Sequence, residues 1–214
     1  YRGSPVGGYD QPLWNARKFL ENNHIKFQPG LNEDLAASAI WGSQQTNLFE
    51  GGKYDGVFGI WYGKGPGVDR CGDVFKHGNM SGPSKHGGVL LIAGDDHAAK
   101  SSTVPHQSEF AFVDASIPVL NPAGVQEILD YGVLGFEMSR FSGCWVAFKT
   151  TAENMDSSSS IDVSPNRINI ELPDFDMPAD GLHIRWPDDW IEQEHRLHNY
   201  KLNAARAFAR ANKI

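Results

Sequence analysis

The sequence predicts an α/β protein with three layers, in which helices cover both faces of a mostly parallel β-sheet. Helical and strand-like patterns alternate along the first 150 residues of the 214-residue chain. The continuous apolar run at 89–93 is typical of a strand that is covered on both faces. Because parallel strands need crossover connections, this alternation favours a parallel sheet flanked by helices.

Periodicity places the elements of this sheet in order along the chain. Apolar residues at helical spacing predict helices, and short alternating or wholly apolar runs predict strands. The predicted helices are 12–22, a helix beginning at Glu33, 68–79 and 123–139, and the predicted strands or extended pieces are 25–28, 54–62, 89–93, 118–120 and 145–148. A glycine-rich loop is expected at 63–70.

The last part of the chain is expected to stand outside this sheet. Serines at 157–160 form a polar linker, the stretch 167–172 predicts one more strand, and 190–212 is a long amphipathic helix. We therefore expect a main domain at 1–155 and, at 156–214, a linker, an extra strand and a helix that lead to a next domain. The chain begins in a loop and ends in a helical pattern, so we expect a fragment of a longer protein that lacks the first strand of its sheet.

Composition and charge argue against a nucleic-acid-binding, membrane-spanning or secreted protein. The net charge is −7, and no basic stripe interleaved with aromatic residues is present, which argues against nucleic-acid binding. No apolar run reaches the roughly 18 residues of a membrane span, and the first residues do not resemble a secretory signal. The two cysteines, Cys71 and Cys144, are too few for an iron–sulfur cluster or a zinc site of their own. We expect free thiols and a cytoplasmic protein without membrane contact.

Ligands of open parallel sheets bind at the carboxyl ends of the strands, so we expect binding and catalytic residues in the loops that follow the strands. These loops are 1–8, 30–33, 63–70 and 94–102. The loop at 63–70 lacks both the Gly-Lys-Ser/Thr ending of a P-loop and the spacing of a dinucleotide fingerprint. Asp95, Asp96 and His97 are consecutive, and neighbouring side chains on one turn rarely converge on an ion, so we predict no metal site.

The helix that begins at Glu33 carries two carboxylates in its first turn. Asn32 is a good N-cap, Glu33 and Asp34 follow it, and residues 35–40 are mostly small and apolar, which predicts a buried helix. Acids at this position are also ordinary countercharges for the positive end of a helix. The pattern alone leaves both interpretations open: a helix-end charge, or an acid available for chemistry.

Six segments of the chain carry a family resemblance when they are taken together. They are 1–5, 32–36, 63–70, 95–102, 121–127 and 184–188. Together they resemble the first domain of indolepyruvate ferredoxin oxidoreductases, especially the large fused bacterial form. That family belongs to the thiamine-diphosphate-dependent 2-oxoacid oxidoreductases, and the matching domain holds the aminopyrimidine ring of the cofactor.

The resemblance implies a catalytic role for Glu33. In the family, the glutamate at this position hydrogen-bonds the pyrimidine N1′. A proton shared there favours the 4′-imino form, whose nitrogen removes the thiazolium C2 proton. Arg2, Gly3 and Gly65 join Glu33 as expected cofactor-binding residues.

A second group of residues is expected on the substrate side. Ser4 falls where related enzymes carry a hydroxyl group beside the substrate carbonyl, and Asp95, Asp96 and His97 lie on the loop expected to face the substrate. The alternatives are a turn serine before a proline for Ser4 and loop capping for the other three.

The resemblance also implies cofactors and partners beyond this chain. Thiamine diphosphate would be held by its pyrimidine half only, with Mg²⁺ and iron–sulfur clusters in other domains, coenzyme A as cosubstrate and ferredoxin as electron acceptor. Diphosphate-binding, iron–sulfur and gamma-type domains would be partners in an oligomer. Two alternatives stay open: a non-catalytic assembly module, and a non-oxidative thiamine diphosphate enzyme of the decarboxylase or transketolase kind. Indolepyruvate and other arylpyruvates are implied as substrates, and branched-chain 2-oxo acids remain open.

Overall fold

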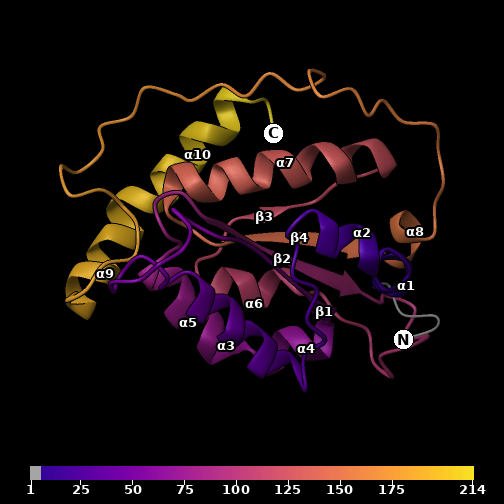
Figure 1. Cartoon of the computed structure of the whole chain (residues 1–214). Coiled ribbons are helices and arrows are strands. Elements are labelled where there is room, and N and C mark those ends of the chain that lie inside the picture. Colours follow the sequence, from indigo (N-terminus) through magenta and orange to yellow (C-terminus); the bar gives the residue numbers. More distant parts are fainter. Residues whose placement is uncertain (1–5) are drawn as a thin grey trace.

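The computed structural model describes residues 6–214, which form an α/β fold with a four-stranded sheet (Figure 1). The strands are β1 (Phe58–Lys64), β2 (Gly88–Asp95), β3 (Val119–Leu120) and β4 (Val146–Thr151). The helices are α1 (Gly7–Asn15), α2 (Arg17–Asn22), α3 (Glu33–Ser43), α4 (Gly65–Arg70), α5 (Gly72–Ser81), α6 (Glu109–Asp114), α7 (Val125–Ser142), α8 (Ala152–Met155), α9 (Trp190–Arg196) and α10 (Leu202–Ala211), with a π-helical turn, η1 (Leu197–Lys201), between the last two.

The sheet is parallel throughout, with the strand order β1-β2-β4-β3. In the register, Ile60 lies opposite Leu90, and Leu91 lies opposite Ala147. Every residue of β2 is buried, as the continuous apolar run predicts. The predicted α/β class with a parallel sheet is therefore confirmed.

Two apolar cores lie on opposite faces of the sheet, which makes the three layers visible in Figure 1. Alternate residues of β2 point to each core: Leu91 packs with side chains of α3 to α6, and Leu90 packs with side chains of α7 and α10. In the first core, the rings of Trp61 and Phe75 pack edge to face with 5.1 Å between their centres. In the second core, Phe208 of α10 is fully buried.

Several predicted elements need correction. The predicted loop at 63–70 is the end of β1 followed by α4, because Pro66 sits in the first turn of that helix, where its missing N–H is not needed. The predicted helix at 12–22 is two helices, α1 and α2, with a break at Ala16. The predicted helix at 190–212 contains the π-helical turn η1.

The stretch 167–172 is not a strand, and 156–189 contains no helix or strand. This segment runs outside the α7 and α10 layer in Figure 1. Ile168 and Ile170 pack against the second core, which explains their alternation without a sheet partner. The Asn212 side chain bonds both the N–H and the carbonyl of Glu171, and Arg167 pairs with Asp130 at 2.7 Å. Among the described residues, no helix combines the length and the apolar character needed to cross a membrane.

Candidate functional site

The carboxyl ends of β1, β2 and β4 meet at one edge of the sheet. Lys64 lies opposite Gly94, and Asp95 lies opposite Thr151, so the chain leaves three neighbouring strands at one level. The Lys64 amine donates to the Ser101 carbonyl at 2.9 Å, which joins the end of β1 to the loop after β2. Two of the loops from which sequence reasoning expected chemistry, 63–70 and 94–102, therefore meet at this edge.

Glu33 begins α3 beside this edge, and three contacts fix it there. The Asn32 side chain caps the helix by accepting from the Leu35 N–H at 2.8 Å, which confirms the predicted N-cap. The Trp61 indole N–H donates to the Glu33 carbonyl at 3.0 Å and ties the helix start to β1. A Cβ on Gly67 would lie 2.6 Å from the Glu33 Cγ, so α4 passes closely under this side chain.

The Glu33 carboxylate itself remains accessible. Its side chain is 31% exposed, and its Oε2 lies 3.9 Å from the Arg70 guanidinium, beyond hydrogen-bonding distance. A carboxylate held at a helix start, with room for another partner, can accept or share a proton with a ligand nitrogen. The side chain therefore has the accessibility that the chemistry expected of it needs.

The surroundings of Glu33 are less buried than predicted. In α3 only Ala37 is fully buried, whereas Leu35 is half exposed and Ala39 is exposed. The expectation of a buried helix is thus wrong for this chain, because the described residues cover only the face of α3 that packs on β1, α4 and α5.

Cys71 lies behind the helix start as a buried, unreactive thiol. Burial, and secondarily the negative charges of Asp34 and Glu33, raise the pKa of Cys71 to about 12. The group therefore stays protonated at neutral pH and is a poor nucleophile. Its sulfur contributes to the first core.

Asp95 and Asp96 are both buried, and their carboxylates are bound by their own chain. Asp95 accepts from the hydroxyl of Ser108 at 2.5 Å and from its N–H at 2.9 Å. Asp96 accepts from the backbone N–H groups of Lys100, Ser101 and Ser102. These bonds shape the loop after β2 and the start of α6, which is the capping role left open above.

The two aspartates have pKa values shifted in opposite directions. Burial raises the pKa of Asp95, although its hydrogen bonds from Ser108 oppose the shift. The hydrogen bond from the Ser101 N–H is the main cause of a lowered pKa for Asp96. The pKa values of these neighbouring carboxyl groups thus differ because desolvation dominates the shift of Asp95, whereas backbone N–H donors dominate the shift of Asp96.

His97 is the exposed member of the predicted substrate-side group. Nearby, Lys149 at the end of β4 forms an ion pair with Glu109 of α6. Burial alone would raise the pKa of Glu109, but the hydrogen bond from Lys149 and the charges of Lys149 and His97 bring it below its usual value. His97 therefore stands at a charged part of the strand edge.

Gly65 is covered by an imidazole ring. A Cβ on Gly65 would lie 2.3 Å from the His106 ring, so only glycine fits at this position. The His106 Nε2 lies 3.1 Å from an Asp69 oxygen, and its Nδ1 lies 3.1 Å from the Val104 carbonyl oxygen. The other predicted cofactor-binding and substrate residues of the first loop, Arg2, Gly3 and Ser4, lie outside the described residues.

Sequence reasoning missed three residues of this site: Arg70, Gly67 and His106. All three contact predicted site residues across distances in sequence that no local pattern reveals. The glycine-rich character of 63–70 was the one available signal for Gly67. Within residues 6–214, no group of three or more His, Cys, Asp or Glu side chains is arranged to hold a metal ion.

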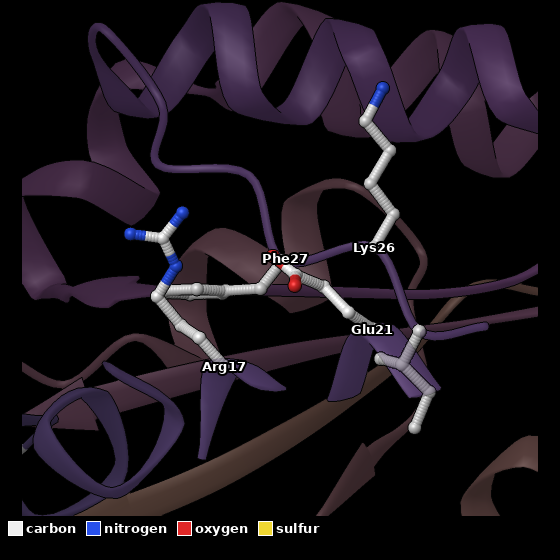
Figure 2. Close-up of a pocket in the computed structure, with 5 residues that line it drawn as sticks. Arg17, Glu21, Lys26 and Phe27 are labelled. Carbon is white, nitrogen blue, oxygen red and sulfur yellow. The ribbon is translucent and has the colours of Figure 1, made fainter. Parts of the chain in front are cut away.

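A small cavity of about 110 Å³ lies apart from these residues, at α2 and the segment after it. Its lining includes Arg17, Glu21, Lys26 and Phe27, and Figure 2 shows the cationic ends of Arg17 and Lys26 pointing to the same side. Arg17 also packs on the Trp14 ring, with 5.3 Å between its guanidinium carbon and the ring centre. None of the predicted site residues lines this cavity.

Fold and site together define an α/β protein with an accessible carboxylate beside the carboxyl edge of a parallel sheet. No protein-family model matches the chain. Over 82 residues, which are 38% of this chain, it is 30% identical to the large ribosomal subunit protein uL3 of Phytoplasma mali (strain AT). That stretch is 35% of the uL3 protein, so the chain spans about a third of that relative.

Proposed function

We propose that this chain provides the aminopyrimidine side of the active site in a thiamine-diphosphate-dependent 2-oxoacid:ferredoxin oxidoreductase of the indolepyruvate type. One observation carries the proposal: the Glu33 carboxylate is 31% exposed at the start of α3, whereas Asp95 and Asp96 on the neighbouring loop are buried and fully engaged. Glu33 is thus the predicted site acid that remains open to a ligand.

The residues around Glu33 fit half of a cofactor site. Leu31 is 89% exposed and Leu35 is 50% exposed, which offers apolar surface beside the carboxylate for an aromatic ring. The Glu33 side chain is 31% exposed, so the half-site is open to solvent in this chain. A second protein surface must cover it, which supports an oligomer or a larger chain with diphosphate-binding, iron–sulfur and gamma-type domains.

Thiamine diphosphate would supply the electron sink for loss of carbon dioxide from a 2-oxo acid, with coenzyme A and ferredoxin as acyl and electron acceptors. The task of this chain is narrower. Glu33 would hold a proton against the pyrimidine N1′, and Gly67, which has no Cβ, would make the room in which the Glu33 side chain packs against α4. Cys71 and Cys144 are both unpaired and buried, which supports a reducing, cytoplasmic location.

The test compares Glu33→Gln with Asp34→Asn in the complete parent protein. Both substitutions remove one charge from the first turn of α3, so they alter the helix end equally. Reduction of a viologen dye by indolepyruvate is measured with and without thiamine diphosphate and coenzyme A, and cofactor binding is followed by tryptophan fluorescence. We expect Glu33→Gln to lose about a hundredfold or more of the activity and Asp34→Asn to retain it.

The other outcomes separate the alternatives. Equal activity in the two variants would make Glu33 a helix-end countercharge and favour an assembly module. Release of an aldehyde without reduction of the dye would identify a non-oxidative thiamine diphosphate enzyme. Faster turnover of branched-chain 2-oxo acids than of indolepyruvate would change the substrate class and leave the role of Glu33 intact.

A further inference from the structure

A groove of about 580 Å³ lies between the free edge of the sheet and α10. Its lining comes from β3 and the residues around it, from α7 and from α10, far from Glu33 in the fold. We propose that this groove binds an extended peptide of a partner polypeptide, which pairs with β3 as a fifth strand and sets an acidic side chain against Arg206. This inference is independent of the function proposed above.

The backbone of β3 offers a hydrogen-bonding edge to such a strand. β3 is the last strand in the order β1-β2-β4-β3, so only β4 pairs with it. The Ala147 N–H donates to the Pro118 carbonyl at 2.8 Å, and Val119 lies opposite Ala147 in the parallel register. Because backbone groups alternate in direction along a strand, the N–H and carbonyl of Val119 point away from β4, towards the groove. β3 is two residues long, so Val119 is the residue of this strand that offers its backbone groups for strand addition.

The side chains of the groove suit the apolar face of an extended peptide. Val119, Tyr131, Met138 and Leu202 line it, and the small side chain of Ala209 leaves space along α10. The volume lies within the range of about 300–1,000 Å³ that ligand sites commonly have. A strand that adds to β3 would place every second side chain on this surface.

Arg206 gives the groove a charge preference. It is the one ionisable side chain among the lining residues other than Tyr131. Its guanidinium donates to the Asn203 Oδ1 at 3.2 Å, one turn earlier on α10, and no carboxylate lies within ion-pair distance of it in the described part of the chain. A guanidinium at an apolar surface, in a chain of net charge −7, selects a carboxylate on the incoming segment.

The experiment measures binding of a fluorescein-labelled peptide, Thr-Val-Asp-Val-Thr-Val, to the full chain by fluorescence anisotropy. A second peptide carries Lys in place of Asp, and a third carries N-methyl groups on alternate backbone nitrogens. The protein variants are Arg206→Glu, Val119→Pro and, as the matched control, Arg210→Glu, which reverses a charge one turn further along the same helix outside the groove.

We expect saturable binding of the Asp peptide, weakened about tenfold by Arg206→Glu through loss of one charge-assisted hydrogen bond. The Lys peptide should bind Arg206→Glu more tightly than it binds the wild-type chain, and Arg210→Glu should behave as wild type. Val119→Pro removes an edge donor that the sheet does not use, so it should weaken binding. If Val119→Pro does not fold, the N-methylated peptide tests the same backbone hydrogen bonds between the peptide and β3.

Three results would overturn the proposal. The first is a lack of saturable binding of the Asp peptide to the wild-type chain. The second is equal loss of affinity in Arg206→Glu and Arg210→Glu, which would reduce the effect to overall charge. The third is tighter binding of octanoate than of the peptide, with displacement of the peptide, which would assign the groove to a small amphipathic acid.

Discussion

The side-chain amine of Lys201 donates a hydrogen bond to the Met80 carbonyl oxygen at 2.8 Å, although 121 positions separate the two residues in the sequence. Met80 lies in the last turn of α5, where carbonyl groups lack helical partners and carry partial negative charge. Lys201 is fully buried, and burial lowers its pKa to about 8. The Lys201 side chain thus connects the C-terminal helices to α5, on the opposite face of the sheet.

We predict that the free energy of unfolding rises between pH 8 and pH 9 because of Lys201. The native amine loses its proton near pH 8, whereas the unfolded amine keeps it up to its ordinary pKa of 10.5. The unfolded state then binds more protons, so stability increases with pH, by at most about 1.4 kcal/mol per pH unit. Urea unfolding at half-unit steps of pH measures this rise, and Lys201→Met should abolish it.

The same titration should reverse above pH 9. Burial raises the pKa of Cys144 to about 11, and that of Cys71 to about 12, from an ordinary value of 9.0. At pH 9 the two unfolded thiols are each half ionised while the native ones stay protonated, so above pH 9 their combined effect outweighs that of Lys201 and stability falls with pH. Replacing both cysteines with alanine should remove the fall. A wild-type curve that is flat from pH 8 to pH 11 would contradict both assignments.

Asp96→Ala should destabilise the fold by about 3 kcal/mol, since three backbone N–H groups lose a charged acceptor. The lowered native pKa means that this stabilisation is present above the ordinary pKa of 3.8 and is lost as the pH falls below it. Wild type and variant should therefore converge in stability as the pH falls from 3.8 through the lower native pKa, in acid unfolding followed by circular dichroism. A constant difference at all pH values would exclude the ionised carboxylate as the cause.

Gly67→Ala tests the close packing beneath Glu33. The new methyl group would lie 2.6 Å from the Glu33 Cγ and must push that side chain away. Gly72→Ala is the matched control, because Gly72 opens α5 with no heavy atom within 4 Å of its added Cβ. If the chain acts as proposed above, we expect Gly67→Ala to lower dye reduction by the complete enzyme about tenfold or more through misplacement of the acid, and Gly72→Ala to leave it unchanged. Similar activities would show that this contact does not position Glu33.

Asn79→Ala should cost about 3 kcal/mol of stability, because its buried amide joins three parts of the first core. Its Nδ2 donates to the carbonyls of Ala115 and Ser116, and its Oδ1 accepts from the Trp145 N–H at 2.9 Å. Asn203→Ala is the comparison, since that exposed amide bonds only near neighbours in sequence: it donates to the Asn199 carbonyl of η1 and accepts from Arg206 of α10. Thermal and urea unfolding should show little change for Asn203→Ala. Equal losses would mean that Asn79 stabilises its helix rather than the core.

Local patterns predicted the parts of the fold that local physics determines. The apolar run of β2 and the Asn32 cap of α3 each follow from a few adjacent residues, and both are confirmed. Alternation at 167–172 was misleading, because an extended segment that packs on helices has the same pattern as a strand. Periodicity reports neither the break at Ala16 nor the π-helical turn η1, whose Lys201 bonds to α5 in the opposite layer.

The sequence indicated single residues of the candidate site but not the contacts between them. The sequence indicated Glu33 as an acid in the first turn of a helix, but its neighbour Arg70 is 37 residues away, where the predicted loop at 63–70 overlaps the predicted helix at 68–79. Asp95 and Asp96 were expected on a ligand-facing loop, and the capping alternative describes what their bonds do. Tertiary contacts decide which carboxylates accept hydrogen bonds from the backbone. The spacing of residues in the sequence therefore cannot show which of them stay available to a ligand.

The strand order has a consequence for biosynthesis. β4 is the last strand in the chain, yet it lies inside the sheet between β2 and β3. Until residues 146–151 have left the ribosome, the fully buried strand β2 is paired only with β1, and β3 has no strand neighbour. A nascent chain therefore carries unpaired, aggregation-prone strand edges until residues 146–151 emerge, and chaperone demand should fall sharply once this interior strand is inserted.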